Sequence, residues 1–318
     1  MTAGYRRVVV VAYPDVELLD VACPGDAFAS AGRFGAEPGY RVELVTAGAR
    51  PVRSSCGITL TPDRALEHVG PDVDTLIVAG GYGHFAACED AAVVEQVRRI
   101  ARNSRRVVSI CTGVSVLAAA GLLDGRRVAT HWAHAARIAA AYPAVTIDSA
   151  PLYIKDGRFY TSAGVTSGLD LSLSLIAEDH GPSLAREVAR TLVTYLHRPG
   201  NQAQISMYLS AGVPGDAAVL DLANYVTGNL NADLSLAALA ERVGMSERHV
   251  RRLFARHLDT TPAQFVRAAR TEAVAQLLGS TGLPLDAIAR RCGFKSTETL
   301  RQAFRDRYGV NPSQYRSA

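Results

Sequence analysis

One cysteine of the sequence stands where a thiol could act as a nucleophile. Cys111 follows the β-branched run RRVVSI (105–110) and precedes TGVSVLAAAG, which has the composition of a helix. In a strand-to-helix elbow the sulfur would lie beside a helix N-terminus, which stabilises a thiolate and lowers the thiol pKa. A small buried hydrophobe is the ordinary alternative for a cysteine. Both interpretations of Cys111 stay open.

Backbone N–H groups near this cysteine could bind an anion. Thr112 directly follows Cys111, and Gly80 and Gly81 end the apolar run VDTLIVAGG (73–81). If the two strand ends meet at one edge of a sheet, the N–H groups of Thr112 and of the Gly80-Gly81 loop predict an anion or oxyanion site.

Arginines form a second set of chemically capable residues. Residues 242–316 hold 14 basic and 6 acidic residues, and all but one of the basic ones are arginine. Arginine can fork onto phosphate or onto the O6 and N7 atoms of guanine. The whole formal net charge of +4 lies in residues 216–318, because residues 1–215 hold equal numbers of basic and acidic residues. This distribution favours nucleic-acid binding over the solvated surface of an ordinary helical bundle.

Most of these arginines lie in a segment that the sequence contains twice. LAALAERVGMSERHVRRLFARHLDTTPAQF (236–265) aligns with LDAIARRCGFKSTETLRQAFRDRYGVNPSQY (285–315). In each copy an apolar helical stripe ends at a glycine (244 and 293), and a serine (246 and 296) can cap the next helix. Each copy predicts a helix-turn-helix unit whose second helix lies in the DNA major groove.

The elements that position Cys111 follow an alternating pattern. Short β-branched runs at 6–13, 40–48, 73–81 and 105–110 are separated by helix-length segments rich in Ala and Leu. This pattern predicts a parallel sheet covered by helices on both faces. Small molecules bind beyond the carboxyl ends of the strands in such sheets. The loops after three of these runs would therefore converge on one edge.

Length and composition set the remaining bounds. A chain of 318 residues predicts two domains, which we place at 1–200 and 217–318 with a linker at 201–216. No stretch approaches the roughly 18–20 apolar residues of a membrane span, and the run at 8–12 is too short for a signal peptide. Five cysteines, an odd number without metal-binding spacing, indicate reduced thiols and a cytoplasmic protein.

The second copy of the repeat carries a family signature. IARRCGFKSTETLRQAFRDRYGVNPSQYR resembles the AraC/XylS family pattern A…GF.S……F…G..P..YR, although Leu300 stands where an aromatic residue is common. The resemblance implies two helix-turn-helix units, joined by a long helix at 262–279, that enter successive turns of the major groove. By position in that family, base contacts would come from Arg248, Arg251, Arg252, Thr297, Thr299, Arg301 and Gln302. Arg267 and Arg270 on the joining helix are candidates for phosphate contacts.

Three segments of the first domain carry a second resemblance. SICTGVSVLAAAGLLDGRRVATHW (109–132), YPDVELLDVACPGDAF (13–28) and the loop at 79–83 resemble the PfpI branch of the class I glutamine amidotransferase-like superfamily. The resemblance implies a flavodoxin-like, doubly wound α/β fold, with Cys111 at the elbow-nucleophile position and Asp20 as the carboxylate that hydrogen-bonds it. Cys-Thr-Gly with an Asp partner is the pattern of isocyanide hydratases. The His and Glu pair of the amidotransferases is missing, so we do not expect glutamine hydrolysis.

His131 has two open interpretations. In the same superfamily a histidine in a THW or THP sequence lies near the cysteine, so His131 could be a base or a ligand contact. It could equally be a histidine satisfied by a backbone carbonyl beside Trp132. His134 would lie one helical turn further on, but two histidines without a third ligand do not predict a metal site. We expect neither a metal nor a cofactor.

The fusion of these two domains resembles the GlxA-like subgroup of AraC regulators. We therefore expect a transcription regulator that binds double-stranded DNA, and whose first domain dimerises and senses an unidentified small molecule or an oxidant near Cys111. RNA polymerase is a candidate partner. Two alternatives stay open: a cysteine-dependent hydratase or hydrolase, of isocyanide hydratase or glyoxalase type, fused to a DNA-binding module, and a scaffold whose first domain only oligomerises.

Overall fold

Seven strands form the central sheet of the first part of the chain. The computed structural model describes residues 4–194, 198, 200, 204 and 216–317, and contacts divide the chain into two units, Met1–Gln204 and Ile205–Ala318. The strand order in the first unit is β10-β11-β7-β6-β1-β2-β5, and every neighbouring pair is parallel except β10 with β11. These strands are β1 (Arg6–Val11), β2 (Tyr40–Thr46), β5 (Arg64–Ala65), β6 (Thr75–Val78), β7 (Arg106–Ile110), β10 (Tyr153–Asp156) and β11 (Phe159–Ser162).

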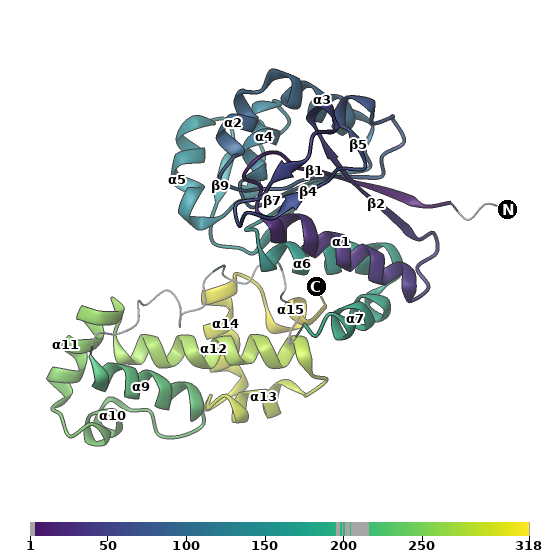
Figure 1. Cartoon of the computed structure of the whole chain (residues 1–318). Helices are drawn as coiled ribbons and strands as arrows, with labels where there is room; N and C mark the ends of the chain where they lie inside the picture. The colour runs from purple at the N-terminus through teal and green to yellow at the C-terminus, as the bar shows by residue number, and fades with distance from the viewer. Residues whose placement is uncertain (1–3, 195–197, 199, 201–203, 205–215, 318) are drawn as a thin grey trace. The chain divides into compact units, whose positions relative to one another are not determined.

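Helices cover both faces of this sheet. Figure 1 shows α1, α6 and α7 on one face and α2, α3 and α4 on the other, and each face has its own apolar core. The run VVVV in β1 is fully buried because both faces are covered. The predicted doubly wound α/β architecture is therefore confirmed. The helices are α1 (Leu18–Arg33), α2 (His84–Glu89), α3 (Ala91–Asn103), α4 (Val114–Ala119), α5 (Trp132–Ala141), α6 (Thr166–His180) and α7 (Pro182–Thr191).

Short elements complete the first unit. Two small sheets pair β3 (Val52–Arg53) with β4 (Thr59–Leu60) and β8 (Arg127–Ala129) with β9 (Thr146–Asp148). Three 3-10 turns are η1 (Ala47–Ala49), η2 (Leu66–His68) and η3 (Cys111–Gly113). Since η3 separates β7 from α4, the elbow at Cys111 is a single tight turn and not the first turn of an α-helix.

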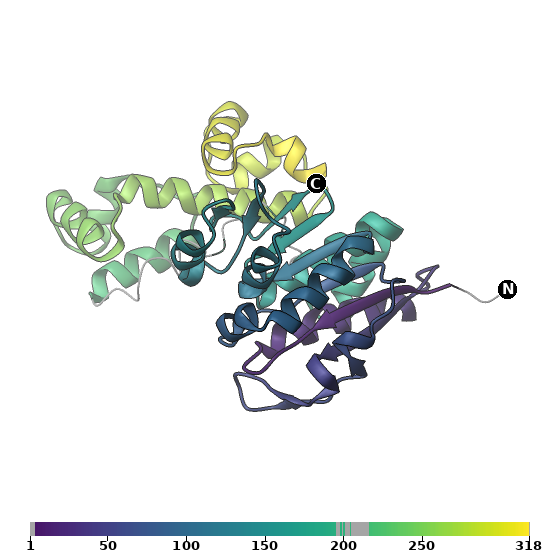
Figure 2. The same cartoon turned by 90° about the horizontal axis from the view of Figure 1, so that it is seen from above.

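The described residues of the second unit form helices joined by loops, without a strand, as predicted. Its helices are α9 (Ala217–Gly228), α10 (Leu236–Arg242), α11 (Glu247–Leu258), α12 (Pro262–Ser280), α13 (Leu285–Arg291), α14 (Thr297–Tyr308) and α15 (Pro312–Ser317). The pairs α10–α11 and α13–α14 are the two predicted helix-turn-helix units. Each pair has a separate apolar core that includes one half of α12, and Figure 2 shows α12 as the long helix that joins them.

Local capping explains where these helices begin. The side chains of Ser246 and Ser296 accept hydrogen bonds from the N–H groups of His249 and Thr299, which caps α11 and α14. Thr261 caps α12 in the same way, and Pro262 occupies its first position. The two serine caps were predicted from the residue types.

One junction inside the second unit is formed by Arg270 of α12. Its guanidinium donates to the carbonyl oxygens of Leu230 (2.9 Å) and Ala232 (3.2 Å), which lie in the loop between α9 and α10. Gly293, in the turn of the second helix-turn-helix unit, approaches the same loop so closely that a Cβ there would lie 2.0 Å from the Leu230 oxygen. The loop, α12 and the second turn therefore meet at one point.

The predicted linker at 201–216 lies outside the described residues except for Gln204 and Asp216. Asp216 caps α9 through the N–H groups of Ala218 and Val219. Among the helices of the described ranges, none has the length and hydropathy that a membrane-spanning segment needs.

The repeat offers a matched pair of glycines for testing this junction. Gly244 and Gly293 both have a positive φ, but a Cβ at Gly244 would meet nothing within 4 Å. We expect Gly244→Ala to lower the free energy of unfolding by about 1 kcal/mol, through backbone strain alone. Gly293→Ala should lower it by about 2–4 kcal/mol, because the Leu230 carbonyl must also move. Urea unfolding of the full chain followed by circular dichroism measures both, and equal losses would contradict the close approach.

Candidate functional site

Cys111 lies in a strained turn between two glycines. Its φ is 56°, which is uncommon for a residue with a side chain. A Cβ at Gly80 would lie 2.6 Å from the Cys111 Cβ, and a Cβ at Gly164 would lie 2.3 Å from it. Backbone therefore packs against the cysteine on both sides, and the elbow can form only where these two positions lack side chains.

Asp20 holds the two flanking loops together. This buried carboxylate accepts from the N–H of Gly80 (3.0 Å) and from the N–H of Val165 (2.7 Å). Val165 has a φ of 52°, a rare conformation for a β-branched residue, so its hydrogen bond to Asp20 supports a strained backbone. Burial raises the pKa of Asp20 to about 7. The two backbone hydrogen bonds lower this pKa, but their effect is smaller than that of burial. Among the described residues no hydrogen bond joins Asp20 to the Cys111 sulfur, so its observed contacts position the loops.

The expected lowering of the thiol pKa is not found. Burial raises the pKa of Cys111 well above its usual range, and the charge of Asp20 raises it further, whereas the N–H and hydroxyl of Thr112 act in the opposite direction. The cysteine is 7% exposed. At neutral pH this sulfur is a thiol and not a thiolate.

The expected oxyanion site is also not preformed. The N–H of Gly80 is bonded to Asp20, and the N–H of Gly81 donates to the Thr112 hydroxyl (2.9 Å), which in turn donates to the Gly81 carbonyl (3.0 Å). Both glycine donors are therefore already used within the protein. The prediction that they await an anion is wrong in this structure.

A small cavity of about 180 Å³ opens beside Cys111. Its lining residues are Glu17, Gly81, Tyr82, Cys111, Thr112, His131, His134 and Val165. His131 lines it and also caps α5, because its Nδ1 accepts from the Ala133 N–H (3.3 Å). Burial, followed by the charge of His134, lowers the pKa of His131, so the imidazole is neutral at physiological pH. Within the described ranges, no group of three or more His, Cys, Asp or Glu side chains could hold a metal ion.

The first candidate DNA helix is α11. Arg248, Arg251 and Arg252 are exposed on it at positions that share one face. Arg251 lies 3.8 Å from Glu247, and Arg252 contacts the His249 ring nitrogen (3.2 Å). Exposed pairs of this kind are weak, so these side chains can exchange them for contacts to DNA.

The second candidate helix, α14, offers a different set. Arg301 and Gln302 are exposed and lie near the acidic side chains of Glu298 and Asp306. Thr299 corrects the prediction, since its hydroxyl accepts from the Ser296 N–H and donates to the Ser296 carbonyl. It closes the capping box at the start of α14 and is not available for a base. Thr297 is partly exposed at the first position of the helix.

The two candidates for phosphate contacts on α12 differ. Arg267 is exposed and forms an ion pair with Asp306. Arg270 does not fit its predicted role, because its guanidinium binds the two loop carbonyls described above. Burial lowers the pKa of Arg270. Its function in the structure is to join the two helix-turn-helix units.

Two residues near the end of the first unit, Arg198 and Gln204, form contacts that were not predicted from the sequence. Arg198 binds Asp170 and Thr166 in the first turns of α6, with an Nη2–Oδ2 distance of 2.7 Å to Asp170. The amide of Gln204 donates to the Thr130 (2.8 Å) and Pro151 (3.1 Å) carbonyls and accepts from the Trp132 N–H (3.0 Å). Arg198 directly precedes a Pro-Gly pair, which predicts only a loop, and no motif marks Gln204.

Fold and sites together define a protein with an elbow-cysteine α/β domain and a tandem helix-turn-helix domain. Residues 6–178 match the DJ-1/PfpI family, and residues 239–318 match a helix-turn-helix domain family. The chain belongs to the HTH-type transcriptional regulators in which a DJ-1/PfpI domain precedes an AraC-type helix-turn-helix domain.

Three relatives illustrate this membership. The chain is 34% identical over 287 residues to the HTH-type transcriptional regulator CdhR of Pseudomonas aeruginosa, covering 90% of this chain and 84% of that protein. It is 28% identical over 314 residues to the regulator GlxA of Rhizobium meliloti, covering 98% and 95%. It is 36% identical over 179 residues to the isonitrile hydratase of Pseudomonas putida, covering 55% and 73%. The hydratase likeness is thus partial.

The raised pKa of Asp20 predicts a pH-dependent stability. The carboxyl titrates near its ordinary 3.8 when unfolded and near 7 when folded, so it stabilises the fold at low pH and loses this contribution as the pH rises from about 4 to about 7. The loss should total roughly 4 kcal/mol and be absent in Asp20→Asn. Urea unfolding of both proteins between pH 4 and 8 gives the difference, in which groups common to both cancel. A pH-independent difference would show that Asp20 is not protonated in the fold.

Two cysteines give an internal comparison of thiol reactivity. Cys56 is exposed, and its hydrogen bond with Ser54 lowers its pKa, whereas Cys111 is buried with a raised pKa. At pH 7, iodoacetamide should modify Cys56 well before Cys111, as read by peptide mass spectrometry. Asp20→Asn should speed the reaction of Cys111 and leave Cys56 unchanged. Modification of Cys111 first would contradict the neutral thiol.

Proposed function

We propose that this regulator reads an asymmetric DNA half-site with one tandem helix-turn-helix domain, and that its first domain dimerises and senses a small molecule near Cys111. The working domains are 1–200 and 217–318. The DNA proposal rests on the exposed arginines on one face of α11 and on the exposed Arg301 and Gln302 of α14. The helix α12 joins the two helix-turn-helix units that hold them.

The two recognition helices differ in chemistry. Among the residues predicted to contact bases, those of α11 are three arginines, which favour phosphate and guanine. Those of α14 include one arginine, Arg301, together with Gln302, which can pair with adenine, and the acidic Glu298 lies beside them. The first helix-turn-helix unit therefore makes more of the phosphate contacts. The two halves of each bound site should differ in sequence.

The sensing proposal rests on the cavity beside Cys111 and on the hydrogen bonds that join Cys111, Thr130 and Gln204. A neutral thiol is a poor target for oxidants, so its raised pKa favours a bound molecule over an oxidant. Gln204 bonds the Thr130 carbonyl, and the Thr130 hydroxyl donates to the Cys111 carbonyl (2.9 Å). A ligand that moves the Cys111 elbow or the His131 loop would therefore disturb the hydrogen bonds of Gln204.

The enzyme is the second candidate function, favoured by the likeness to isonitrile hydratase. A raised thiol pKa and occupied glycine N–H groups weigh against a nucleophile that is ready to react. Turnover of an isocyanide that Cys111→Ser abolishes would establish it.

We also propose that the protein acts in the cytoplasm, because a regulator must reach DNA there. We further propose that it is a homodimer and that RNA polymerase is a partner.

Removal of single arginines tests the DNA proposal. We expect Arg251→Ala and Arg301→Ala each to weaken binding to a selected duplex about 10-fold to 100-fold, the range for one lost base contact, and to relax preference at one position. Arg102→Ala, which removes an exposed arginine from α3 of the first unit, is the matched control and should change affinity little. Fluorescence anisotropy at several salt concentrations measures this. Unchanged affinity and preference in both variants would exclude these helices as readers.

A further inference from the structure

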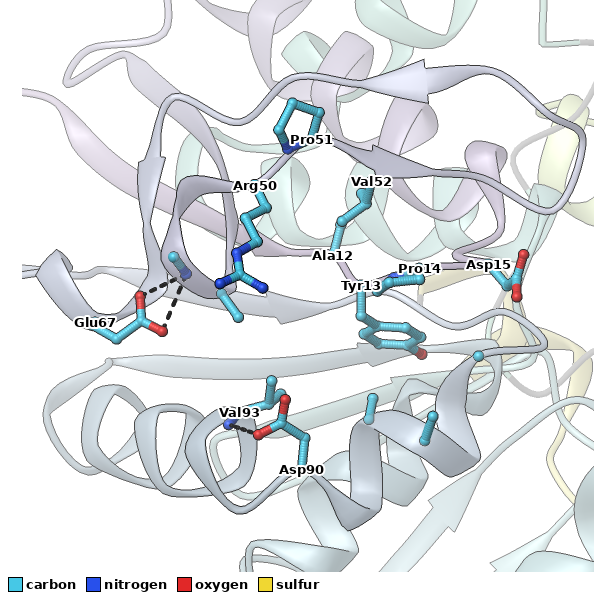
Figure 3. Close-up of a pocket in the computed structure, with 15 residues that line it drawn as sticks. Ala12, Tyr13, Pro14, Asp15, Arg50, Pro51, Val52, Glu67, Asp90 and Val93 are labelled. Carbon is cyan, nitrogen blue, oxygen red and sulfur yellow. Dashed lines mark hydrogen bonds between the residues drawn. The ribbon is translucent and has the colours of Figure 1, made fainter.

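The first unit has further cavities besides the one at Cys111. Figure 3 shows a cavity of about 570 Å³, with Tyr13, Arg50 and Val93 in its lining. Like the Cys111 cavity, it lies beyond the carboxyl ends of the parallel strands, where such sheets usually bind small molecules. Another cavity, of about 430 Å³, lies at the opposite edge, where these strands begin. The fold assigns no ligand to that edge, so its occupant has to be inferred from the lining side chains.

Three arginines line the cavity at the amino edge of the sheet. Arg7, Arg41 and Arg64 occupy the first or second positions of β1, β2 and β5. The strand β2 lies between β1 and β5, and both pairs are parallel. Because neighbouring parallel strands begin at the same edge, three guanidinium groups from separate segments gather there.

One buried carboxylate orients all three guanidinium groups. Glu43 of β2 is 4% exposed, and its Oε2 lies 2.9 Å from the Arg7 Nη2 and 2.9 Å from the Arg64 Nε. Its Oε1 lies 3.5 Å from the Arg41 Nε. Burial acts to raise the pKa of Glu43, but the hydrogen bond from Arg7 and the charges of the arginines lower it below its usual value. Glu43 is therefore ionised at neutral pH.

The positive charge of this cluster is not balanced. Arg7 uses its guanidinium on Glu43 and on Asp72. Within the described ranges, Arg41 and Arg64 donate no hydrogen bond, and each forms an ion pair with Glu43 alone. Three guanidinium groups against two carboxylates leave one positive charge, and like charges gathered in this way repel one another. An anion bound to the free Nη groups would relieve this repulsion.

The free donors and the remaining lining fit an organic phosphate. Guanidinium forks bind phosphate oxygens bidentately, and a phosphate monoester carries about −1.5 to −2 charges at neutral pH. The cavity volume lies within the range of about 300–1,000 Å³ of small-molecule sites. The Tyr5 ring, which is 68% exposed, also lines the cavity and offers a face for a planar ring of the ligand.

We propose that this cavity binds an organic phosphate, with its phosphate group on Arg41 and Arg64 and an aromatic ring on Tyr5. The site is separate from the Cys111 cavity and from the helices proposed to read DNA, so it does not depend on either of those roles. Free phosphate has the same anionic group, and the choice of probes separates the two sources.

Three probes divide the ligand into its parts. We would titrate the full chain with adenosine monophosphate (AMP), inorganic phosphate and adenosine by isothermal calorimetry at constant ionic strength. AMP should bind at least about fivefold more tightly than inorganic phosphate, the gain expected from one stacked base. It should bind at least about tenfold more tightly than adenosine, which lacks the anion. Equal affinity for AMP and inorganic phosphate would overturn the contact with Tyr5 and the organic ligand. Equal affinity for adenosine and AMP, or no binding of AMP and phosphate at millimolar concentration, would overturn the site.

Two arginine variants and one tyrosine variant assign the contacts. Arg41→Gln and Arg64→Gln should each weaken AMP binding at least about tenfold, since each removes a charge-assisted fork. Tyr5→Leu should weaken AMP binding and leave the affinity for inorganic phosphate unchanged. Unchanged AMP affinity in both arginine variants would contradict the site. Thermal unfolding curves check that the variants are folded, and the 67% exposed Arg41 side chain makes the first of them a mild change.

Two further variants test whether the phosphate binds at this place. Arg102→Gln, which removes an exposed arginine from α3 of the same unit, is the matched control and should bind AMP like the original protein. A loss in Arg102→Gln as large as in Arg41→Gln would show only a response to total charge. The same loss in Arg251→Gln would place the phosphate on α11. Either result would overturn the site at the amino edge.

Discussion

The spacing of the two DNA-reading units depends on one helix and one arginine. α12 is 19 residues long, which corresponds to about 28 Å, close to the roughly 34 Å of one turn of DNA. Each half of α12 belongs to the core of a different unit, so neither unit can rotate without breaking its own packing. Arg270 ties α12 to the Leu230 loop, against which the second turn packs at Gly293. The tandem domain is therefore one rigid reader and not two independent ones.

In the α/β unit, Asp20 joins separate loops in the way that Arg270 does in the helical unit. Its two hydrogen bonds hold the Gly80 and Val165 loops around Cys111, so a single buried carboxylate determines the shape of the small cavity. Burial makes the sulfur a neutral thiol and leaves Asp20 close to its midpoint at neutral pH. Near this site, Arg198 is bonded to Asp170 and Gln204 to the Thr130 carbonyl.

The sequence predicted features that local patterns determine. The run VVVV, the serine caps and the turn glycines each specify their own structure, and the repeat doubled the evidence for the helix-turn-helix units. Features that depend on distant partners were not predictable. Nothing near Arg270 indicates that its partners lie about forty residues earlier. The partners of the Gly80 and Gly81 N–H groups lie on other elements, and the thiol pKa depends on burial that only the assembled fold creates.

The proposed function requires one monomer to read two unlike sequences in successive major grooves. Selection of bound duplexes from a random pool, followed by sequencing, would reveal both of these sequences. We expect enrichment of half-sites that contain two dissimilar blocks centred about 10 base pairs apart, one of them rich in guanine contacts for α11. Recovery of two identical blocks at that spacing, of a single block, or of no enriched sequence would contradict it.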